Sequence, residues 1–262
     1  MLSIRNLTKI YDDGTVALED VSFDVPDREF MVIIGLSGSG KSTLLRCINR
    51  LIEPTEGAVL LDGADLTHAG PEELRRARRG IGMIFQQFNL VKRSSVLTNV
   101  LSGRLGYARP RSTIFYRWPA AERERAARAL DRVGLTEQAG KRADELSGGQ
   151  QQRVGIARAL MQEPRMILAD EPVASLDPVL AHGILGHLEG LNREDGITVL
   201  CSLHYLDLVQ RYATSVIGLR SGRVVYRGSA DDVRAMTDEQ FKEIYGEEAV
   251  RTNAGRPAKA GA

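Results

Sequence analysis

The stretch from Phe30 to Leu51 constrains the fold of this chain more than any other. An apolar run, FMVII, leads into GLSGSGKS at residues 35–42, and a helical pattern with apolar residues at i, i+1, i+4 and i+7 follows. The octet matches GxxxxGK[ST] in the strand, turn and helix order that this motif needs. We therefore predict an α/β fold with a phosphate-binding loop at the end of a buried strand.

Each part of this loop has a chemical role. Its glycines let backbone N–H groups converge on phosphate oxygens, at a helix N-terminus whose dipole favours anions. Lys41 is expected to hold the β- and γ-phosphates, and the Ser42 hydroxyl is placed to ligate Mg²⁺. The alternative is a glycine-rich turn that binds nothing. The strand and helix on either side favour a magnesium nucleotide as the ligand.

Two adjacent carboxylates, Asp170 and Glu171, follow the apolar run MILA at residues 166–169. Adjacent residues at a strand end point to opposite sides, so one carboxylate can serve the metal and the other the attacking water. We expect Asp170 to complete the Mg²⁺ shell and Glu171 to polarise water. An exposed acidic pair is the alternative if the motif is taken alone, but the phosphate loop favours the functional interpretation.

Strand and helix patterns alternate along most of the chain, which is typical of an α/β fold with a largely parallel sheet. The opening 34 residues are rich in strand patterns, and the block from Ser94 to Arg142 is mainly helical. The last dozen residues, RTNAGRPAKAGA, have almost nothing apolar to bury, so the tail 247–262 is predicted to be disordered. Predicted helices cover 41–51, 71–79, 120–133, 149–162 and 179–191.

Composition excludes several classes of protein. The chain has 262 residues, a net charge of +1 and 43% apolar residues, which is ordinary globular composition. Its longest apolar run, Phe30–Ile34, is far shorter than the ~18–20 residues that cross a bilayer, and the N-terminus lacks the apolar core of a secretory signal. Cys47 and Cys201 lie in apolar surroundings and are expected to be buried thiols.

The neutral total conceals a segregated charge. Residues 74–121 contain ten Lys and Arg and no acid, so this segment is +10 and the rest of the chain is −9. Within it, an aromatic and basic insertion at 103–119 has three interpretations. It packs against the helical block, contacts membrane subunits or anionic headgroups, or, least favoured, binds single-stranded nucleic acid.

A second anion-binding pattern, LSGGQ at residues 146–150, opens another helix. With this motif the sequence resembles the ATP-binding-cassette (ABC) ATPases over about residues 2–240. Further landmarks match in the family's order: Tyr11 resembles the aromatic that stacks on adenine, Gln86 the Q-loop glutamine with Gln87 as its rival, and His204 the switch histidine. Ser175-Leu176-Asp177 resembles the D-loop.

The resemblance implies an ABC-type nucleotide-binding domain over 1–246. It has a RecA-like, mostly parallel sheet core, an antiparallel β subdomain and an α-helical signature subdomain inserted at about 94–162. It also implies a head-to-tail dimer, in which the loop of one copy and the signature of the other enclose each ATP. Gln86 would contact Mg²⁺ and the lytic water, and His204 would stabilise charge on the γ-phosphate.

The predicted site therefore has three overlapping sets of residues. The catalytic residues are Lys41, Gln86, Glu171 and His204. The metal residues are Ser42, Gln86 and Asp170. The ATP-binding residues are Tyr11, Gly35, Ser37, Gly38, Ser39, Gly40, Lys41, Ser42, Thr43, Gln86, Ser147, Gly148, Gly149, Gln150, Asp177 and His204.

Within the family, the chain is most similar to the ATPase subunits of phosphonate importers. The resemblance rests on ILADEPVASLDP at 167–178, on Ser202-Leu203-His204 and on the extended insertion after Gln86. It implies two separate permease subunits, a solute-binding protein that acts indirectly, no nucleic acid, and a peripheral position on the cytoplasmic face of the inner membrane. Import of phosphate, phosphite or a polar amino acid, and a soluble ABC ATPase, are the alternatives.

Two residues depart from the family pattern. Leu36 stands where proline is frequent, and Gly155 lies inside the signature helix where alanine is common. A glycine there is expected to cost about 0.5–1 kcal/mol of helix stability. Neither position carries a catalytic role, so the predicted activity is unaffected.

Overall fold

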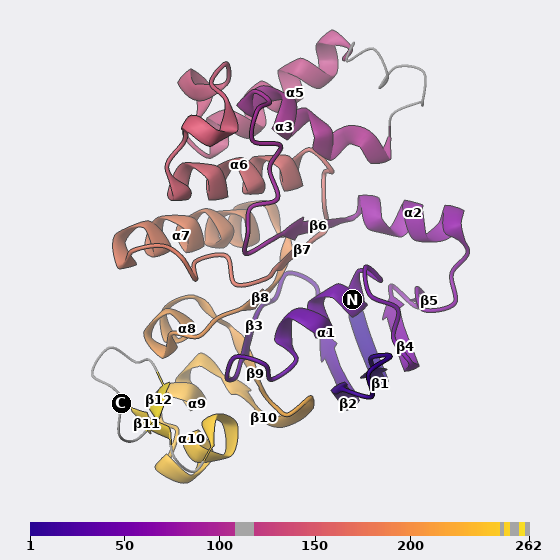
Figure 1. Ribbon diagram of the computed structural model, residues 1–262, viewed down its shortest axis with the longest axis vertical. Helices are drawn as coiled ribbons and strands as arrows, with labels where there is room; N and C mark the ends of the chain where they lie inside the picture. Colours follow the sequence, from indigo (N-terminus) through magenta and orange to yellow (C-terminus); the bar gives the residue numbers. More distant parts are fainter. Residues whose placement is uncertain (108–117, 247–248, 252–256, 260–262) are drawn as a thin grey trace.

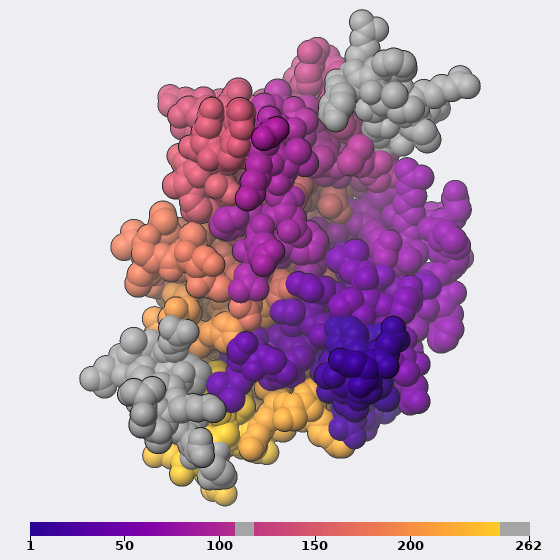
Figure 2. Space-filling model, in the orientation of Figure 1, coloured from indigo at the N-terminus to yellow at the C-terminus, as the bar shows by residue number. Residues whose placement is uncertain are grey.

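A computed structural model describes residues 1–107, 118–246, 249–251 and 257–259 (Figure 1). A six-stranded sheet, a four-stranded sheet, a small two-stranded sheet and a helical lobe are the main parts of the described structure. The helical lobe lies at one end, and the N-terminal strands with α1 lie below it in the same view (Figures 1 and 2). The strands are β1 (Leu2–Ile10), β2 (Val16–Val25), β3 (Phe30–Ile34), β4 (Glu56–Leu61), β5 (Ala64–Asp65), β6 (Ile81–Ile84), β7 (Met166–Ala169), β8 (Thr198–Ser202), β9 (Ser215–Arg220), β10 (Arg223–Ser229), β11 (Ala249–Arg251) and β12 (Pro257–Lys259).

The helices vary in length from one turn to five. They are α1 (Lys41–Ile48), α2 (Pro71–Arg79), α3 (Val96–Leu101), α5 (Ala120–Arg132), α6 (Gly148–Leu160), α7 (Pro178–Asp195), α8 (Leu206–Tyr212), α9 (Ala230–Arg234) and α10 (Asp238–Tyr245). Three short 3-10 helices are η1 (Ser102–Gly106), η2 (Thr136–Gln138) and η3 (Ala143–Glu145). No helix in the described ranges is both long and apolar enough to span a bilayer.

The central sheet has the order β10-β9-β3-β8-β7-β6. Strands β9, β3, β8, β7 and β6 are parallel, and only the edge strand β10 is antiparallel. Strands β3, β6, β7 and β8 are buried along their whole length, which explains why they are short, continuous apolar runs rather than alternating patterns. The predicted α/β fold with a largely parallel sheet is confirmed.

The second sheet, in the order β2-β1-β4-β5, is antiparallel throughout. Its apolar face packs with α1 and one face of the central sheet into a single core. Helix α1 packs between the two sheets. This packing fixes the position of the loop at residues 35–40, which immediately precedes the helix.

The helical lobe consists of α3, η1, α5 and α6 (Figure 1). The two predicted helices of this lobe end close to their predicted residues. Helix α5 ends at Arg132 rather than Val133, and α6 covers 148–160 rather than 149–162. One described end of the insertion packs inward, because Tyr107 donates to the carbonyl oxygen of Gln162 at 2.8 Å and lies against Arg104. The middle of the insertion, 108–117, lies outside the described residues.

The C-terminal elements differ most from the sequence analysis. Helices α8, α9 and α10 were not predicted, although α9 and α10 begin with the capping boxes Ser229/Asp232 and Thr237/Gln240 and α10 buries Phe241, Ile244 and Tyr245 on one face. In the tail, where the sequence predicts no structure, Ala249–Arg251 and Pro257–Lys259 pair as antiparallel strands. Backbone pairing of this kind needs no apolar side chains, so composition alone gives no sign of it.

Candidate active site

The phosphate-loop motif lies between β3 and α1, and close packing demands glycine at two of its positions. Gly35 has φ 147° and Gly40 has φ 104°. A Cβ atom at Gly35 would lie 2.2 Å from the carbonyl oxygen of Leu219, and one at Gly40 would lie 2.5 Å from that of Ala17. The backbones of β9 and β2 therefore approach the loop so closely that only glycine fits at these two positions.

Lys41 is the first residue of α1 and is only 3% exposed. Its Nζ donates to the carbonyl oxygens of Gly35 at 2.9 Å and Leu36 at 2.8 Å, so the side chain curls back over the loop. Nζ also lies 3.9 Å from Glu171 Oε1. Burial lowers the pKa of this ammonium group to about 8.

Asp170 follows β7 and is 1% exposed. The Ser42 hydroxyl donates to its Oδ1 at 2.6 Å, and the guanidinium of Arg46 contacts its Oδ2 at 3.2 Å. The buried Ser202 hydroxyl lies 3.5 Å from Oδ1. The two residues predicted to hold a metal, Ser42 and Asp170, are therefore in direct contact although they are far apart in the sequence.

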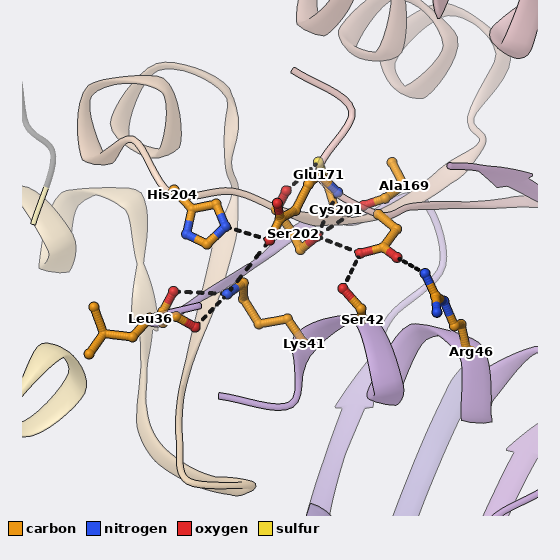
Figure 3. Close-up of polar contacts among 11 residues, drawn as sticks. Leu36, Lys41, Ser42, Arg46, Ala169, Glu171, Cys201, Ser202 and His204 are labelled. Carbon is orange, nitrogen blue, oxygen red and sulfur yellow. Dashed lines mark hydrogen bonds and ion pairs between the residues drawn. The ribbon is translucent and has the colours of Figure 1, made fainter. Parts of the chain in front are cut away.

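Glu171 turns the other way, as Figure 3 shows. Its backbone has φ 46°, and its Oε1 accepts a hydrogen bond from His204 Nε2. Lys41 points toward the same carboxylate. The pKa of the Glu171 carboxyl lies below its usual value, chiefly because the carboxylate accepts the hydrogen bond from His204. The positive charges of His204 and Lys41 also lower this pKa, whereas burial raises it.

Tyr11 and Thr43 stand beside the loop. The Tyr11 hydroxyl lies 3.2 Å from Thr43 Oγ1, and the ring is partly exposed, with Lys9 Nζ 5.3 Å from its centre. The structure therefore places the predicted base-stacking aromatic at the edge of the phosphate loop.

Gln86 follows β6 and is exposed in a hollow lined also by Gln87 and Ser175. Among the described residues, no hydrogen bond joins its side chain to Ser42 or Asp170. The loop after it is held instead by Arg158 of α6, which donates to the carbonyl oxygens of Phe88 and Asn89 at 2.8 and 2.5 Å.

The signature residues form the N-terminus of α6, where Ser147 and Gly148 are exposed and Gly149 is buried. Ser147 Oγ accepts from the backbone N–H of Gln150 at 3.4 Å, while Gln150 Oε1 accepts from that of Ser147 at 3.0 Å, which makes a capping box. Asp177 caps α7 in the same way, accepting from Leu180 N–H at 3.0 Å. Helix α6 lies in the helical lobe, away from α1 (Figure 1), so one chain does not bring its signature and its phosphate loop together.

Sequence reasoning missed Arg46, Arg158 and Ser202. Arg46 lies one turn after Ser42, a spacing that brings two helix residues to the same face and is the one signal the sequence offers. Ser202 lies at the end of an apolar strand, and nothing local marks it. Two other histidines have partners outside the site: His68 pairs with Asp65, and His182 with Tyr212.

The chain belongs to the ABC transporter family. The profile described as ABC transporter matches residues 18–174. A bacterial ABC transporter cassette, MJ0796, solved as a dimer, is 37% identical with a TM-score of 0.79 over 88% of this chain and 99% of that one. The same cassette bound to ADP and Pi is 38% identical with a TM-score of 0.76, at the same coverage. The chain is thus an ATPase of a family that uses ATP with Mg²⁺.

Among curated relatives, the similarity is to phosphonate import proteins. The protein named Phosphonates import ATP-binding protein PhnC of Shouchella clausii (strain KSM-K16) is 52% identical over 246 residues, which are 94% of this chain and 91% of the relative. The PhnC protein of Bacillus anthracis is 51% identical over 247 residues, with 94% and 95% covered. Similarity therefore extends over nearly the whole of both chains.

Proposed function

We propose that this protein is the ATP-hydrolysing subunit of an importer, and that it drives phosphonate uptake through separate permease subunits and a solute-binding protein. One observation carries the catalytic part: Glu171 lies between His204 and Lys41, next to the contact between Ser42 and Asp170. The names of relatives at about 50% identity support the phosphonate part.

The phosphate loop fits a polyphosphate. Ser39 Oγ is buried and has no hydrogen-bond partner among the described residues, so a phosphate oxygen would satisfy it. Lys41 would exchange its two carbonyl partners for the β- and γ-phosphates, a stronger and charge-assisted pairing. Tyr11 would stack on the base, with Thr43 alongside.

The metal residues fit Mg²⁺, which prefers oxygen ligands. Ser42 Oγ and Asp170 Oδ1 already face each other at 2.6 Å, and Gln86 would join them by a movement of its loop. When bound, Mg²⁺ neutralises charge on the phosphates.

The Glu171 carboxylate would accept a hydrogen bond from the attacking water, because its lowered pKa keeps the carboxylate ionised at neutral pH. His204, now bonded to Glu171, would turn toward the γ-phosphate and stabilise the charge that develops there. The Ser147–Gln150 turn and Asp177 would close over the nucleotide of a second copy.

The partner surface is proposed to be a groove between α2, β6 and the helical lobe. Its lining includes Arg75, Arg78, Arg79 and Tyr107, together with apolar residues such as Leu74 and Met83. Part of the acid-free segment 74–121 thus lines one hollow. We infer that the permease docks there, and that the protein sits on the cytoplasmic face of the membrane.

The Glu171→Gln variant tests the catalytic assignment. It should bind ATP, accumulate as a closed dimer and lose about 10²–10⁴-fold in hydrolysis. Wild-type hydrolysis by this variant would remove Glu171 from the proposed role.

The solute is tested separately, because the cassette does not touch the cargo. In the reconstituted transporter, binding protein loaded with phosphonate should stimulate ATP hydrolysis. Stimulation by phosphate, phosphite or an amino acid instead would reassign the solute and leave the ATPase assignment intact.

A further inference from the structure

Arg46 and Ser42, on the same face of α1, each contact one of the two carboxylate oxygens of Asp170. Ser42 Oγ donates to Asp170 Oδ1 at 2.6 Å, and Arg46 Nη2 lies 3.2 Å from Oδ2 (Figure 3). The residues are four apart, so their side chains project one helical turn from each other. Asp170 is thereby held in one orientation.

Asp170 needs these contacts because its carboxylate is buried. Asp170 is 1% exposed, and a buried carboxylate is costly unless it is paired and hydrogen-bonded. Within the described ranges, Arg46 is the one residue in an ion pair with Asp170. The Arg46 side chain is 43% exposed, so it brings charge to the carboxylate without full desolvation of its own.

We propose that Arg46 is a positioning residue for the magnesium site. By holding Oδ2, it keeps Oδ1 turned toward Ser42, where the metal would be bound. This inference rests on the proposed function, in which Ser42 and Asp170 hold Mg²⁺. Among the described residues, no side-chain hydrogen bond or ion pair joins Arg46 to the phosphate loop, so we expect Arg46 to act on the metal and not on metal-free nucleotide.

The test separates metal from nucleotide. Binding of the β,γ-imido analogue of ATP is measured by calorimetry, once with EDTA and once across a Mg²⁺ titration. Arg46→Ala should bind the analogue in EDTA like wild type. Its Mg²⁺ concentration for half-maximal enhancement of binding should rise about tenfold or more, since partners that orient metal ligands contribute about that much to metal affinity.

Two further variants sharpen the result. Arg46→Lys keeps the charge but loses the planar geometry, so it should recover part of the Mg²⁺ affinity and stands in if Arg46→Ala does not fold. Arg165→Ala is the matched control, because Arg165 precedes the same strand β7 at its other end and pairs with Asp62 at 2.7 Å. This control should need no more Mg²⁺ than wild type.

The outcomes distinguish the two levels of the proposal. If Arg46→Ala and Arg46→Lys both match the Mg²⁺ requirement of wild type, Arg46 is not a positioning residue. A loss of binding in EDTA would likewise overturn the inference, because Arg46 would then act on the nucleotide. If Mg²⁺ does not enhance binding even to wild type, the proposed metal role of Ser42 and Asp170 fails instead.

Discussion

The backbone N–H of Glu171 donates to the hydroxyl of Ser202 at 2.8 Å. Glu171 has φ 46°, in the left-handed region that non-glycine residues seldom occupy. The Ser202 hydroxyl, fully buried at the end of β8, thus fixes the turn at which the chain leaves β7. That turn sends Asp170 toward Ser42 and Glu171 toward His204.

Ser202→Ala should therefore damage catalysis more than binding. The variant leaves the Glu171 N–H without its partner, at a cost of about 1–3 kcal/mol in unfolding free energy. A misplaced Glu171 should reduce kcat roughly tenfold to hundredfold with little change in ATP affinity. Urea unfolding and steady-state hydrolysis check both effects.

Ser215→Ala is the matched control for this variant. Ser215 Oγ is also buried but has no hydrogen-bond partner among the described residues, so its removal should change neither stability nor kcat appreciably. Equal effects from the two serine variants would contradict the role given to Ser202.

ATP binding should depend on pH through Lys41. Burial lowers the pKa of its ammonium group to about 8 in the free protein, and only the protonated form attracts phosphate. As pH rises past about 8, the neutral form accumulates and the affinity for ATP should fall by up to about tenfold per pH unit. Binding near pH 9 should take up a proton, which calorimetry in buffers of different ionisation enthalpy measures.

Lys41→Arg is the control for this pH dependence. A guanidinium does not titrate in this range, so the variant should bind ATP with weaker but nearly pH-independent affinity. An unchanged decline above pH 8 in Lys41→Arg would assign the titration to another group.

Gly155 and Gly103 should respond to alanine in opposite directions. A Cβ at Gly155, inside α6, meets nothing within 4 Å, so Gly155→Ala should raise the unfolding free energy by about 0.5–1 kcal/mol. A Cβ at Gly103 would lie 2.1 Å from the carbonyl oxygen of Arg158, and Gly103→Ala should cost about 1–3 kcal/mol. Chemical denaturation compares the pair, and destabilisation by Gly155→Ala would refute the open space inferred there.

Complementation tests the head-to-tail dimer. Lys41→Ala and Ser147→Arg variants should each be inactive alone, because each damages both sites of a symmetric dimer. Mixed together, they form some dimers in which one intact loop faces one intact signature, so hydrolysis should reappear. Continued inactivity of a mixture shown to contain heterodimers would argue that each chain completes its own site.

Charge reversal tests the groove proposed for the permease. Arg75 and Arg76 are neighbours on α2 and both exposed, but only Arg75 lines the groove. Arg75→Glu should weaken co-purification with the permease and lower permease-stimulated hydrolysis, while Arg76→Glu should affect both less. Basal hydrolysis by the isolated protein serves as the folding check, and equal losses from the two reversals would count against a docked partner in the groove.

The sequence predicted the parts of this protein that depend on short-range order. The phosphate loop, the strand before it and helix α1 follow from local periodicity and from glycine at tightly packed positions. Helix α2 starts at Pro71 as predicted, whereas α7 starts at Pro178, one residue before the predicted start, and its cap at Asp177 was not predicted. The roles of all the site residues remain predictions, because their partners would be a nucleotide, a metal and, for the signature residues, a second chain.

The net charge of residues 74–121, counted from the sequence, overstates the unpaired positive charge of this segment in the fold. The segment 74–121 has no acid of its own, yet Arg104 pairs with Glu122 and Glu163, at 3.1 and 3.0 Å, from beyond its end. Arg78 donates to the carbonyl oxygens of Asn49 and Arg50. The charge of Arg104 is thus compensated within the fold. The carbonyl partners of Arg78 are neutral, so together with Arg75 and Arg79 it keeps the groove basic.

By itself, the sequence predicted a phosphate-binding loop at a strand-to-helix turn, and it contains acids suited to magnesium and water. Only the tertiary structure decided which groups meet. Strand β8 lies between β3 and β7, so the carboxyl ends of three parallel strands converge and bring Lys41, Glu171 and His204 together. The order of strands in the sheet depends on packing between segments that are distant in the sequence, so it cannot be predicted from local residue patterns.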